Sequence, residues 1–187
     1  MAITTLDPNT ALIVVDLQRG IVASSFIHPI DGIVSRARAL LDAFRERGLQ
    51  VVLVNVADVA PGRTERPPHS RSFPAGWTDF IPELDQQPDD IVVTKRTWGA
   101  FANTDLEDQL KALSVTQVVI AGVATATGVE ATARQAHEYG FNVTLALDAM
   151  TDAHSEAHDY SIKTVFPRLG ETGTTQDVID LLATRSA

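Results

Sequence analysis

Unbroken apolar runs alternate along the chain with stretches in which apolar residues recur three and four positions apart. Continuous apolar runs are typical of strands covered on both faces, as in parallel sheets, and the wider spacing is typical of helices with one buried face. The runs predict strands at 11–16, 50–56, 91–94, 118–122, 142–147 and 169–172. The spaced repeats predict helices at 29–48, 105–113, 128–139, 155–166 and 175–183.

This alternation predicts one α/β domain that spans residues 1–187. Strand–helix–strand units connect by right-handed crossovers and build a parallel sheet with helices on both faces. We expect a three-layer α/β/α sandwich around a mostly parallel, six-stranded, Rossmann-like sheet. No internal repeat, low-complexity segment or linker in the sequence indicates a second domain.

Residues 58–84 interrupt the alternation, because they are rich in proline and glycine and show little periodicity. A loop of this length inside a compact domain is usually a lid or a binding loop. Its basic side chains, Arg63, Arg66, His69 and Arg71, are candidates to meet a substrate carboxylate. Among them, we expect Arg63 to take part in substrate binding.

The charge and the amino-acid composition narrow the classes of partner. A formal net charge of −9 argues against nucleic acid or an anionic membrane as the main partner. The sequence contains no cysteine, which removes disulfides, thiolate metal sites and cysteine nucleophiles together. The N-terminus shows no secretory pattern, and no apolar run approaches the ~18–20 residues that span a bilayer. We therefore expect a cytoplasmic protein that acts on a small molecule.

Polar residues follow three of the predicted strands, at Asp16, at Lys95 and in the turn 122–128. The carboxyl ends of parallel strands share one edge of the sheet, where open α/β sheets bind their ligands. A lysine beside an aspartate holds the carboxylate ionised, or positions a substrate anion while a protonated aspartate donates a proton. The amides at the beginning of the helix near Gly128 offer hydrogen bonds to an oxyanion. The structural alternative is that Asp16 caps the next turn and Lys95 is a solvated charge.

Three sequence blocks resemble the signature blocks of one known protein family. They occur in the family's order, and the match covers nearly the whole chain. They read ALIVVDLQ at 11–18, TKRTWGAF at 94–101 and VVIAGVATATGVEATARQAHEYGFNVTLALDAM at 118–150. In these blocks the chain resembles the isochorismatase-like (cysteine) hydrolase superfamily. The family's first block supplies an aspartate as general acid/base, the second a lysine, and the third a cysteine nucleophile at a helix N-terminus. Carried over by motif, the catalytic positions are Asp16, Lys95 and Gly128.

The third block departs from the family pattern, since most members read C-V-E-x-T-A-R and this chain reads GVEATAR at 128–134. Without a thiol, amidase chemistry through a thioester is excluded. Isochorismatases of the superfamily also tend to carry glycine there, and they hydrolyse a vinyl ether by protonating it. The resemblance therefore implies non-covalent acid/base hydrolysis of a small, anionic molecule, with Asp16 as the proton donor and Lys95 as its charge partner. The small residues at 124–126 argue against isochorismate itself, because isochorismatases usually carry aromatic and histidine residues there. The alternative is a catalytically inactive member that binds a small molecule or a partner protein.

The resemblance also implies a cis peptide bond between Val123 and Ala124, which directs the amides of the turn at the substrate. We expect the following residues to bind the substrate: Gln18, Arg63, Trp98, Val123, Ala124 and Thr127. For Trp98, packing in the core or at an interface is the alternative. Family members commonly form dimers or larger homo-oligomers, and the segment VFPRLGETGTT at 165–175 is our candidate for part of that interface.

The remaining polar residues are weaker candidates. Thr125 and Thr127 have no histidine near them in the sequence to act as a base, so we expect neither to be a nucleophile. His154 and His158 are four residues apart, and we interpret them as a solvated helix face rather than a metal site. The zinc motif of nicotinamidase-like relatives is missing, because residues 55–63 contain no histidine. We therefore predict no metal and no cofactor.

Overall fold

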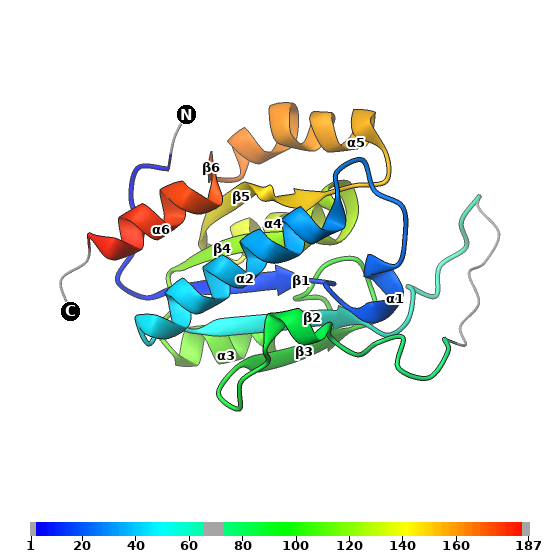
Figure 1. Ribbon diagram of the computed structural model, residues 1–187, viewed down its shortest axis with the longest axis horizontal. Helices are drawn as coiled ribbons and strands as arrows, with labels where there is room; N and C mark the ends of the chain where they lie inside the picture. Colours follow the sequence, from blue (N-terminus) through cyan, green and yellow to red (C-terminus); the bar gives the residue numbers. More distant parts are fainter. Residues whose placement is uncertain (1–2, 66–72, 185–187) are drawn as a thin grey trace.

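The computed structural model describes residues 3–65 and 73–184 of the chain. Six strands form one sheet in the order β3-β2-β1-β4-β5-β6, and every neighbouring pair is parallel (Figure 1). The strands are β1 (Thr10–Val15), β2 (Val51–Val56), β3 (Ile91–Lys95), β4 (Gln117–Val123), β5 (Asn142–Thr151) and β6 (Glu171–Gly173). The α-helices are α1 (Arg19–Val22), α2 (Ile30–Glu46), α3 (Leu106–Ala112), α4 (Glu130–Glu138), α5 (Ser155–Tyr160) and α6 (Thr175–Ala183).

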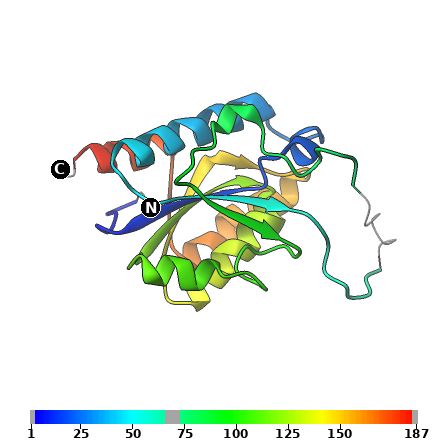
Figure 2. The same cartoon turned by 90° about the horizontal axis from the view of Figure 1, so that it is seen from below.

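Helices cover both faces of the sheet, so the molecule has three layers (Figure 2). On one face α2 and α6 bury an apolar cluster that includes Leu40, Phe44 and Val178. On the other face α3, α4 and the chain after α5 bury a second cluster that includes Leu110 and Phe166. The predicted α/β/α sandwich around a six-stranded parallel sheet is confirmed.

The two helices on the first face follow directly from local sequence signals. Apolar residues of α2 at helical spacing are buried: Ile33, Ala37, Leu40, Leu41 and Phe44. The helix α6 begins with a capping box, in which Thr174 accepts from the backbone of Asp177 and the Asp177 side chain accepts from the backbone of Thr174. Its bounds coincide with the predicted helix at 175–183.

The strand β5 is longer than the sequence predicted. It continues to Thr151 instead of ending at Leu147, because Met150 and Thr151 pair with Gly122 and Val123 of β4. The register shifts between the pairs at Ile120 and Gly122, so β5 bulges before it pairs again. The bulge hides the continuation from a pattern search, since polar Asp148 interrupts the apolar run.

Two of the predicted helices contain wider or tighter turns. The segment before α4 is a π-helical turn, η2 (Thr125–Val129), and α5 is followed by η3 (Ser161–Val165) and the 3₁₀ turn η4 (Phe166–Arg168). A spacing of 3.6 residues does not distinguish these turns from an α-helix. The predictions also miss the short helices α1 and η1 (Pro82–Leu84), because so few residues show no repeat.

The strands β1, β3 and β4 run in one direction and bring their carboxyl ends to one edge of the sheet. Gly122, near the end of β4, has a φ of 114°, which favours glycine. A Cβ atom there would collide with the carbonyl oxygen of Val15 on β1. Glycine therefore lets β4 lie close against β1 just before the turn that follows.

The described parts of the proline- and glycine-rich segment after β2 have little regular structure. Residues 57–65 run outward from the carboxyl end of β2 (Figures 1 and 2). Where the chain returns to the body, Phe80 forms an isolated antiparallel bridge with Gln18. Across the residues that the structure describes, no helix has both the length and the apolar character needed to cross a bilayer.

Candidate active site

Asp16 and Lys95 form a buried ion pair at the carboxyl edge of the sheet. Lys95 Nζ donates to Asp16 Oδ2 at 2.7 Å and to the carbonyl of Thr97 at 3.3 Å. Asp16 is 5% exposed and Lys95 is 1% exposed, so neither is a solvated surface charge. The other carboxylate oxygen, Asp16 Oδ1, is buried and has no hydrogen-bond partner among the described residues. The two oxygens of this carboxylate therefore have different surroundings.

Burial raises the pKa of Asp16 from 3.8 to about 6, although the charge of Lys95 and its hydrogen bond act in the opposite direction. Desolvation is the larger effect because a carboxylate loses its hydration in the interior. A carboxyl group with a pKa in this range gives up and takes back a proton near neutral pH. The pair therefore has the protonation behaviour of a general acid/base.

The backbone of Asp16 is in an unusual conformation. Its φ of 53° lies in the left-handed region, which costs a residue other than glycine about 1–3 kcal/mol. The Asp16 N–H still donates to the carbonyl of Val54 at 2.8 Å, so the residue stays tied to β2. The chain leaves β1 abruptly at this point, and the packing around Asp16 holds the strained backbone. Strain of this kind is concentrated at functional sites.

Gly128, in η2, lies directly beside the Asp16 carboxylate. A Cβ atom at position 128 would be 3.1 Å from Asp16 Oδ2 and 3.2 Å from the carbonyl oxygen of Val123. The peptide bond between Val123 and Ala124 is cis, as the resemblance implied. Gly128 is therefore packed closely against a carboxylate oxygen, a carbonyl oxygen and a methyl group of Val15, which a Cβ atom would approach to 3.1 Å.

Several amides of the turn are engaged within the protein. The N–H of Ala126 donates to Asp152 Oδ2 at 2.8 Å. The N–H groups of Thr127 and Val129 both donate to the carbonyl of Ala124 at 3.1 Å. These bonds hold the turn in place from both sides. The sequence did not reveal Asp152, which lies just beyond β5 and fixes the turn through this contact.

This arrangement of strands and site agrees with comparisons with known proteins. Residues 10–177 match the family described as the isochorismatase domain. The chain belongs to this family. The uncharacterized isochorismatase family protein YwoC of Bacillus subtilis (strain 168) is 39% identical over 182 residues, which cover 92% of this chain and 93% of YwoC. The ureidoacrylate amidohydrolase RutB of Stutzerimonas stutzeri (strain A1501) is 31% identical in an alignment that covers 84% of this chain and 77% of that enzyme.

A solved structure supports the same assignment. An isochorismatase family protein from Burkholderia thailandensis superposes with a TM-score of 0.93 and 38% sequence identity, over 98% of this chain and 100% of that chain. The likeness extends over the whole sheet and both helix layers. The chain is thus an isochorismatase-family hydrolase by sequence and by fold.

Within this isochorismatase fold, two polar side chains of α4 hold the segment that follows Lys95. Thr132 Oγ1 donates to the carbonyl of Gly128 at 2.7 Å and accepts from the N–H of Ala100 at 3.1 Å. Gln135 Oε1 accepts from the N–H of Phe101 at 3.0 Å. These contacts link the two halves of the site. Polar residues on the buried face of the predicted helix at 128–139 were the signal that could have revealed them.

Gln18 connects the site to the segment that returns after residue 72. Its side chain donates to the carbonyls of Val56 at 3.0 Å and Trp77 at 3.3 Å, and accepts from the N–H of Val56 at 2.7 Å. Both ends of the amide are therefore engaged with the backbone. The structure gives Gln18 a positioning contact, and its binding of substrate stays a prediction.

The other predicted binding residues differ in their placement. Trp98 is 66% exposed and does not pack in the core. Arg63 is exposed in the segment that runs outward from β2. Arg66, His69 and Arg71 lie outside the described residues. The structure does not bring Arg63 to the Asp16–Lys95 pair, whereas Val123, Ala124 and Thr127 belong to the turn beside it.

The interpretation of His158 as a solvated residue is wrong. It is 6% exposed, and its Nδ1 is 2.8 Å from the hydroxyl of Thr125. The separation of 33 residues hid this histidine from a search for a base close to Thr125 in the sequence. Thr125 is itself fully buried. His154, one turn earlier, is exposed.

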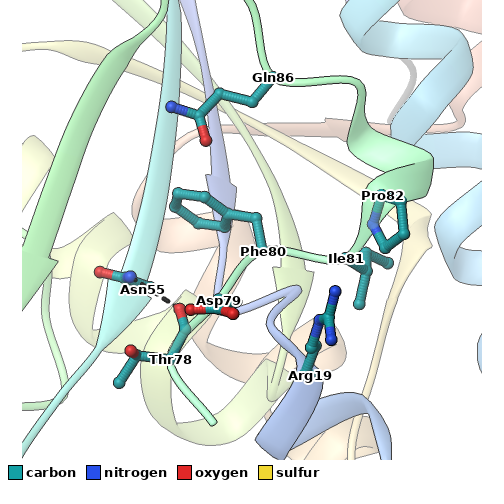
Figure 3. A pocket seen from close by; sticks show the side chains of 8 residues that line it. All are labelled: Arg19, Asn55, Thr78, Asp79, Phe80, Ile81, Pro82 and Gln86. Atoms are coloured by element: carbon teal, nitrogen blue, oxygen red, sulfur yellow. Dashed lines mark hydrogen bonds between the residues drawn. The ribbon is translucent and has the colours of Figure 1, made fainter. Parts of the chain in front are cut away.

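A cavity of about 510 Å³ lies between β2, the beginning of α1 and the returning segment (Figure 3). It is lined by Arg19, Asn55, Thr78, Asp79, Phe80, Ile81, Pro82 and Gln86. Asn55 Nδ2 donates to the carbonyl of Thr78 at 2.9 Å and holds the returning segment against β2. The predicted catalytic residues Asp16, Lys95 and Gly128 do not line this cavity.

Proposed function

We propose that this isochorismatase-family protein hydrolyses a small, anionic molecule by acid/base catalysis without a covalent intermediate. The observation that carries the proposal is the buried Asp16–Lys95 pair beside Gly128. A chain without cysteine lacks the thiol that would form a thioester. The nucleophile is then water, and the residue that moves protons is Asp16.

The two oxygens of Asp16 have separate tasks in this proposal. Oδ1, which has no partner among the described residues, carries the proton and faces the substrate. Oδ2 accepts from Lys95 and lies 3.1 Å from the position that a side chain at 128 would occupy. A water molecule over Gly128 would donate to Oδ2 and to the carbonyl of Val123. Because glycine has no side chain, nothing at position 128 presses on Oδ2 or blocks this approach.

The reaction proceeds in two proton transfers. Asp16 Oδ1 gives its proton to the substrate at the bond to be broken, which makes the adjacent carbon electrophilic. The oxygen of the water over Gly128 bonds to that carbon, and the bond to the leaving group breaks. A proton of the attacking water returns to the Asp16 carboxylate. The sum is one substrate and one water converted to two products, with Asp16 restored.

Lys95 and the turn supply the electrostatic part of the proposal. The Lys95 ammonium stabilises the Asp16 carboxylate after it gives up its proton. The amides of Ala124 and Gly128 hold an oxyanion or a substrate carboxylate. Substrate contacts come from Val123, Thr127 and, through assembly of a homo-oligomer, the exposed Trp98.

The test is a turnover assay with the purified protein. Isochorismate, small carbamates and small primary amides that carry a carboxylate are supplied in H₂¹⁸O, and products are identified by mass spectrometry. We expect turnover of one class, incorporation of ¹⁸O into the product, and no covalent adduct in the intact-protein mass. Asp16→Asn abolishes turnover. Full activity in that variant, or an accumulated adduct, contradicts the proposal.

A second candidate is an inactive family member that binds a small molecule or a partner protein. The observation that favours it is the near-complete burial of Asp16 and Lys95 together with the absence of cysteine. It predicts no turnover of any compound in the panel, and binding of a ligand that Asp16→Asn leaves unchanged. Titration calorimetry on both proteins separates it from the hydrolase.

A further inference from the structure

A second cavity, of about 800 Å³, is lined by residues of α2, β5, α5 and β6 and of the chain next to them, at the β6 edge of the sheet. Its apolar lining includes Ile33, Leu147 and Met150, and its polar lining includes His28 and His158. Neither Asp16 nor Lys95 lines it. Cavities of this size with a mostly apolar lining and a few convergent polar groups are typical of small-molecule sites.

The cavity arises from the irregular path of β5. Between the pairs at Leu145 and Met150 the strand bulges away from β4, and the bulge contains Leu147 and Asp148. On the other side β6 ends at Gly173, so no strand covers β5 beyond Ala146. The space is therefore built into the sheet edge.

Two imidazole rings meet at this cavity, with ring centroids 5.0 Å apart. His28 Nδ1 lies 3.0 Å from the hydroxyl of Thr151, and His158 Nδ1 lies 2.8 Å from the hydroxyl of Thr125. Neither threonine lines the cavity. Since both rings line the cavity and each Nδ1 is engaged by a threonine, Nε2 is the ring nitrogen left to meet a ligand.

The hydroxyl groups decide which nitrogen carries the proton. Thr151 Oγ1 accepts from the N–H of His28 at 3.3 Å and has its own proton to give to His28 Nδ1. The buried hydroxyl of Thr125 lies 2.8 Å from His158 Nδ1, the partner to which it gives its proton in our assignment. Because a buried hydroxyl proton needs an acceptor, we assign the imidazole protons to Nε2 in both rings. In this assignment each ring has an N–H donor at Nε2.

The charged residues at the cavity leave these donors available. Arg36 pairs with Asp148 at 3.2 Å, and Asp148 Oδ1 also accepts from the backbone and hydroxyl of Thr175 at 2.6 and 2.9 Å. The negative charge of Asp148 is therefore compensated by its own contacts. Burial and the neighbouring His28 lower the pKa of His158 and outweigh the opposite effect of Asp152 and Asp159, which keeps that ring neutral at physiological pH.

We propose that this cavity binds a small carboxylic acid with an apolar body, whose carboxylate accepts hydrogen bonds from Nε2 of His28 and His158. The apolar body packs against Ile33, Leu147 and Met150. The site is independent of turnover at Asp16. A ligand bound to His158 contacts the same side chain that hydrogen-bonds to Thr125. Thr125 is the first residue of η2, the turn that contains Gly128.

The experiment is titration of the full-length protein with sodium benzoate and sodium hexanoate, followed by calorimetry and by ¹⁵N NMR of the histidine rings. We expect saturable binding of both acids and shifts of the Nε2 signals of His28 and His158. Benzylamine, which has the same ring and the opposite charge, does not bind. His28→Phe keeps the ring shape, removes the donor and weakens binding at least tenfold. His137→Gln, an exposed histidine on α4, leaves binding unchanged.

A second variant, which fills the cavity, tests the proposal independently in case His28→Phe does not fold. A Cβ atom at Gly32, which lines the cavity, approaches only Arg36 Nη1, at 3.2 Å, so Gly32→Leu extends into the space. It is expected to abolish binding while the circular dichroism spectrum stays unchanged. Absence of saturable binding of both acids, retained binding in Gly32→Leu, or loss of binding in Asp16→Asn overturns the proposal. The last outcome would place the acids at the Asp16 site.

Discussion

Gly128 presents no side chain to the carboxylate of Asp16, although a Cβ atom there would be only 3.1 Å from Oδ2. This distance is shorter than ordinary van der Waals contact, so a side chain at 128 would displace anything held against the carboxylate. The two residues are far apart in the sequence and meet because β1 and β4 are neighbours. Their relationship makes position 128 the most direct place to test where the attacking water binds.

Gly128→Ala is expected to lower kcat/KM by about 10²-fold or more, because the added methyl group presses on Oδ2 and displaces the water proposed to bind there. The fold should tolerate the change, since the neighbours need to move by only a few tenths of an ångström and overpacking of this kind costs about 1–3 kcal/mol. Steady-state kinetics and urea unfolding of the same samples check both parts. Retained activity in a folded variant would show that the water binds elsewhere.

The activity is expected to fall as the pH rises through about 6. The proposed mechanism needs Asp16 protonated in the free enzyme, and burial raises its pKa to about 6. Above that value the protonated fraction, and with it kcat/KM, decreases about tenfold per pH unit. A pH–rate profile between pH 4.5 and 8 measures this. A rate that increases through pH 6 would mean that Asp16 acts first as a base.

The same pKa predicts how stability depends on pH. The native state binds a proton at Asp16 that the unfolded state, with a pKa near 3.8, has already released. The contribution of Asp16 to the free energy of unfolding is therefore full below pH 4 and is lost as the pH rises to about 6, a change of about 3 kcal/mol. Urea unfolding of wild type and Asp16→Asn between pH 4 and 7 isolates this contribution. A stability difference that does not vary with pH contradicts it.

The convergence of Asp16 and Lys95 was predictable, because both follow buried strands and parallel strands end at one edge. The contacts that surround this pair were not predictable. His158 reaches Thr125 only through the packing of α5 against η2, and no local pattern encodes that contact. Gln18 is polar and adjacent to Asp16, yet it binds backbone from two distant segments. Contacts that depend on the tertiary path of loops are invisible to periodicity.

Lys95→Met and Asp16→Asn/Lys95→Met test whether the two side chains act as a unit. Removing only the ammonium leaves a buried carboxyl group without its cation and should cost about 3–5 kcal/mol. The double variant has no buried charge and should recover most of that stability, while both variants are inactive. A double-mutant cycle by urea unfolding measures the coupling. If the losses of the single variants simply add, the pair is not coupled.

Thr132→Val tests the link between the Gly128 turn and the segment after Lys95. Valine keeps the shape of threonine but leaves the Gly128 carbonyl and the Ala100 N–H without this partner, at a cost of about 1–3 kcal/mol. Thr144→Val is the matched control. The buried Thr144 hydroxyl accepts a hydrogen bond of 3.0 Å from Gln117, and neither residue belongs to the turn. Both variants should lose similar stability, and only Thr132→Val should lower kcat. Equal effects of the two variants on kcat would reduce Thr132 to a packing residue, whereas a selective loss shows that its hydrogen bonds position the turn over Asp16.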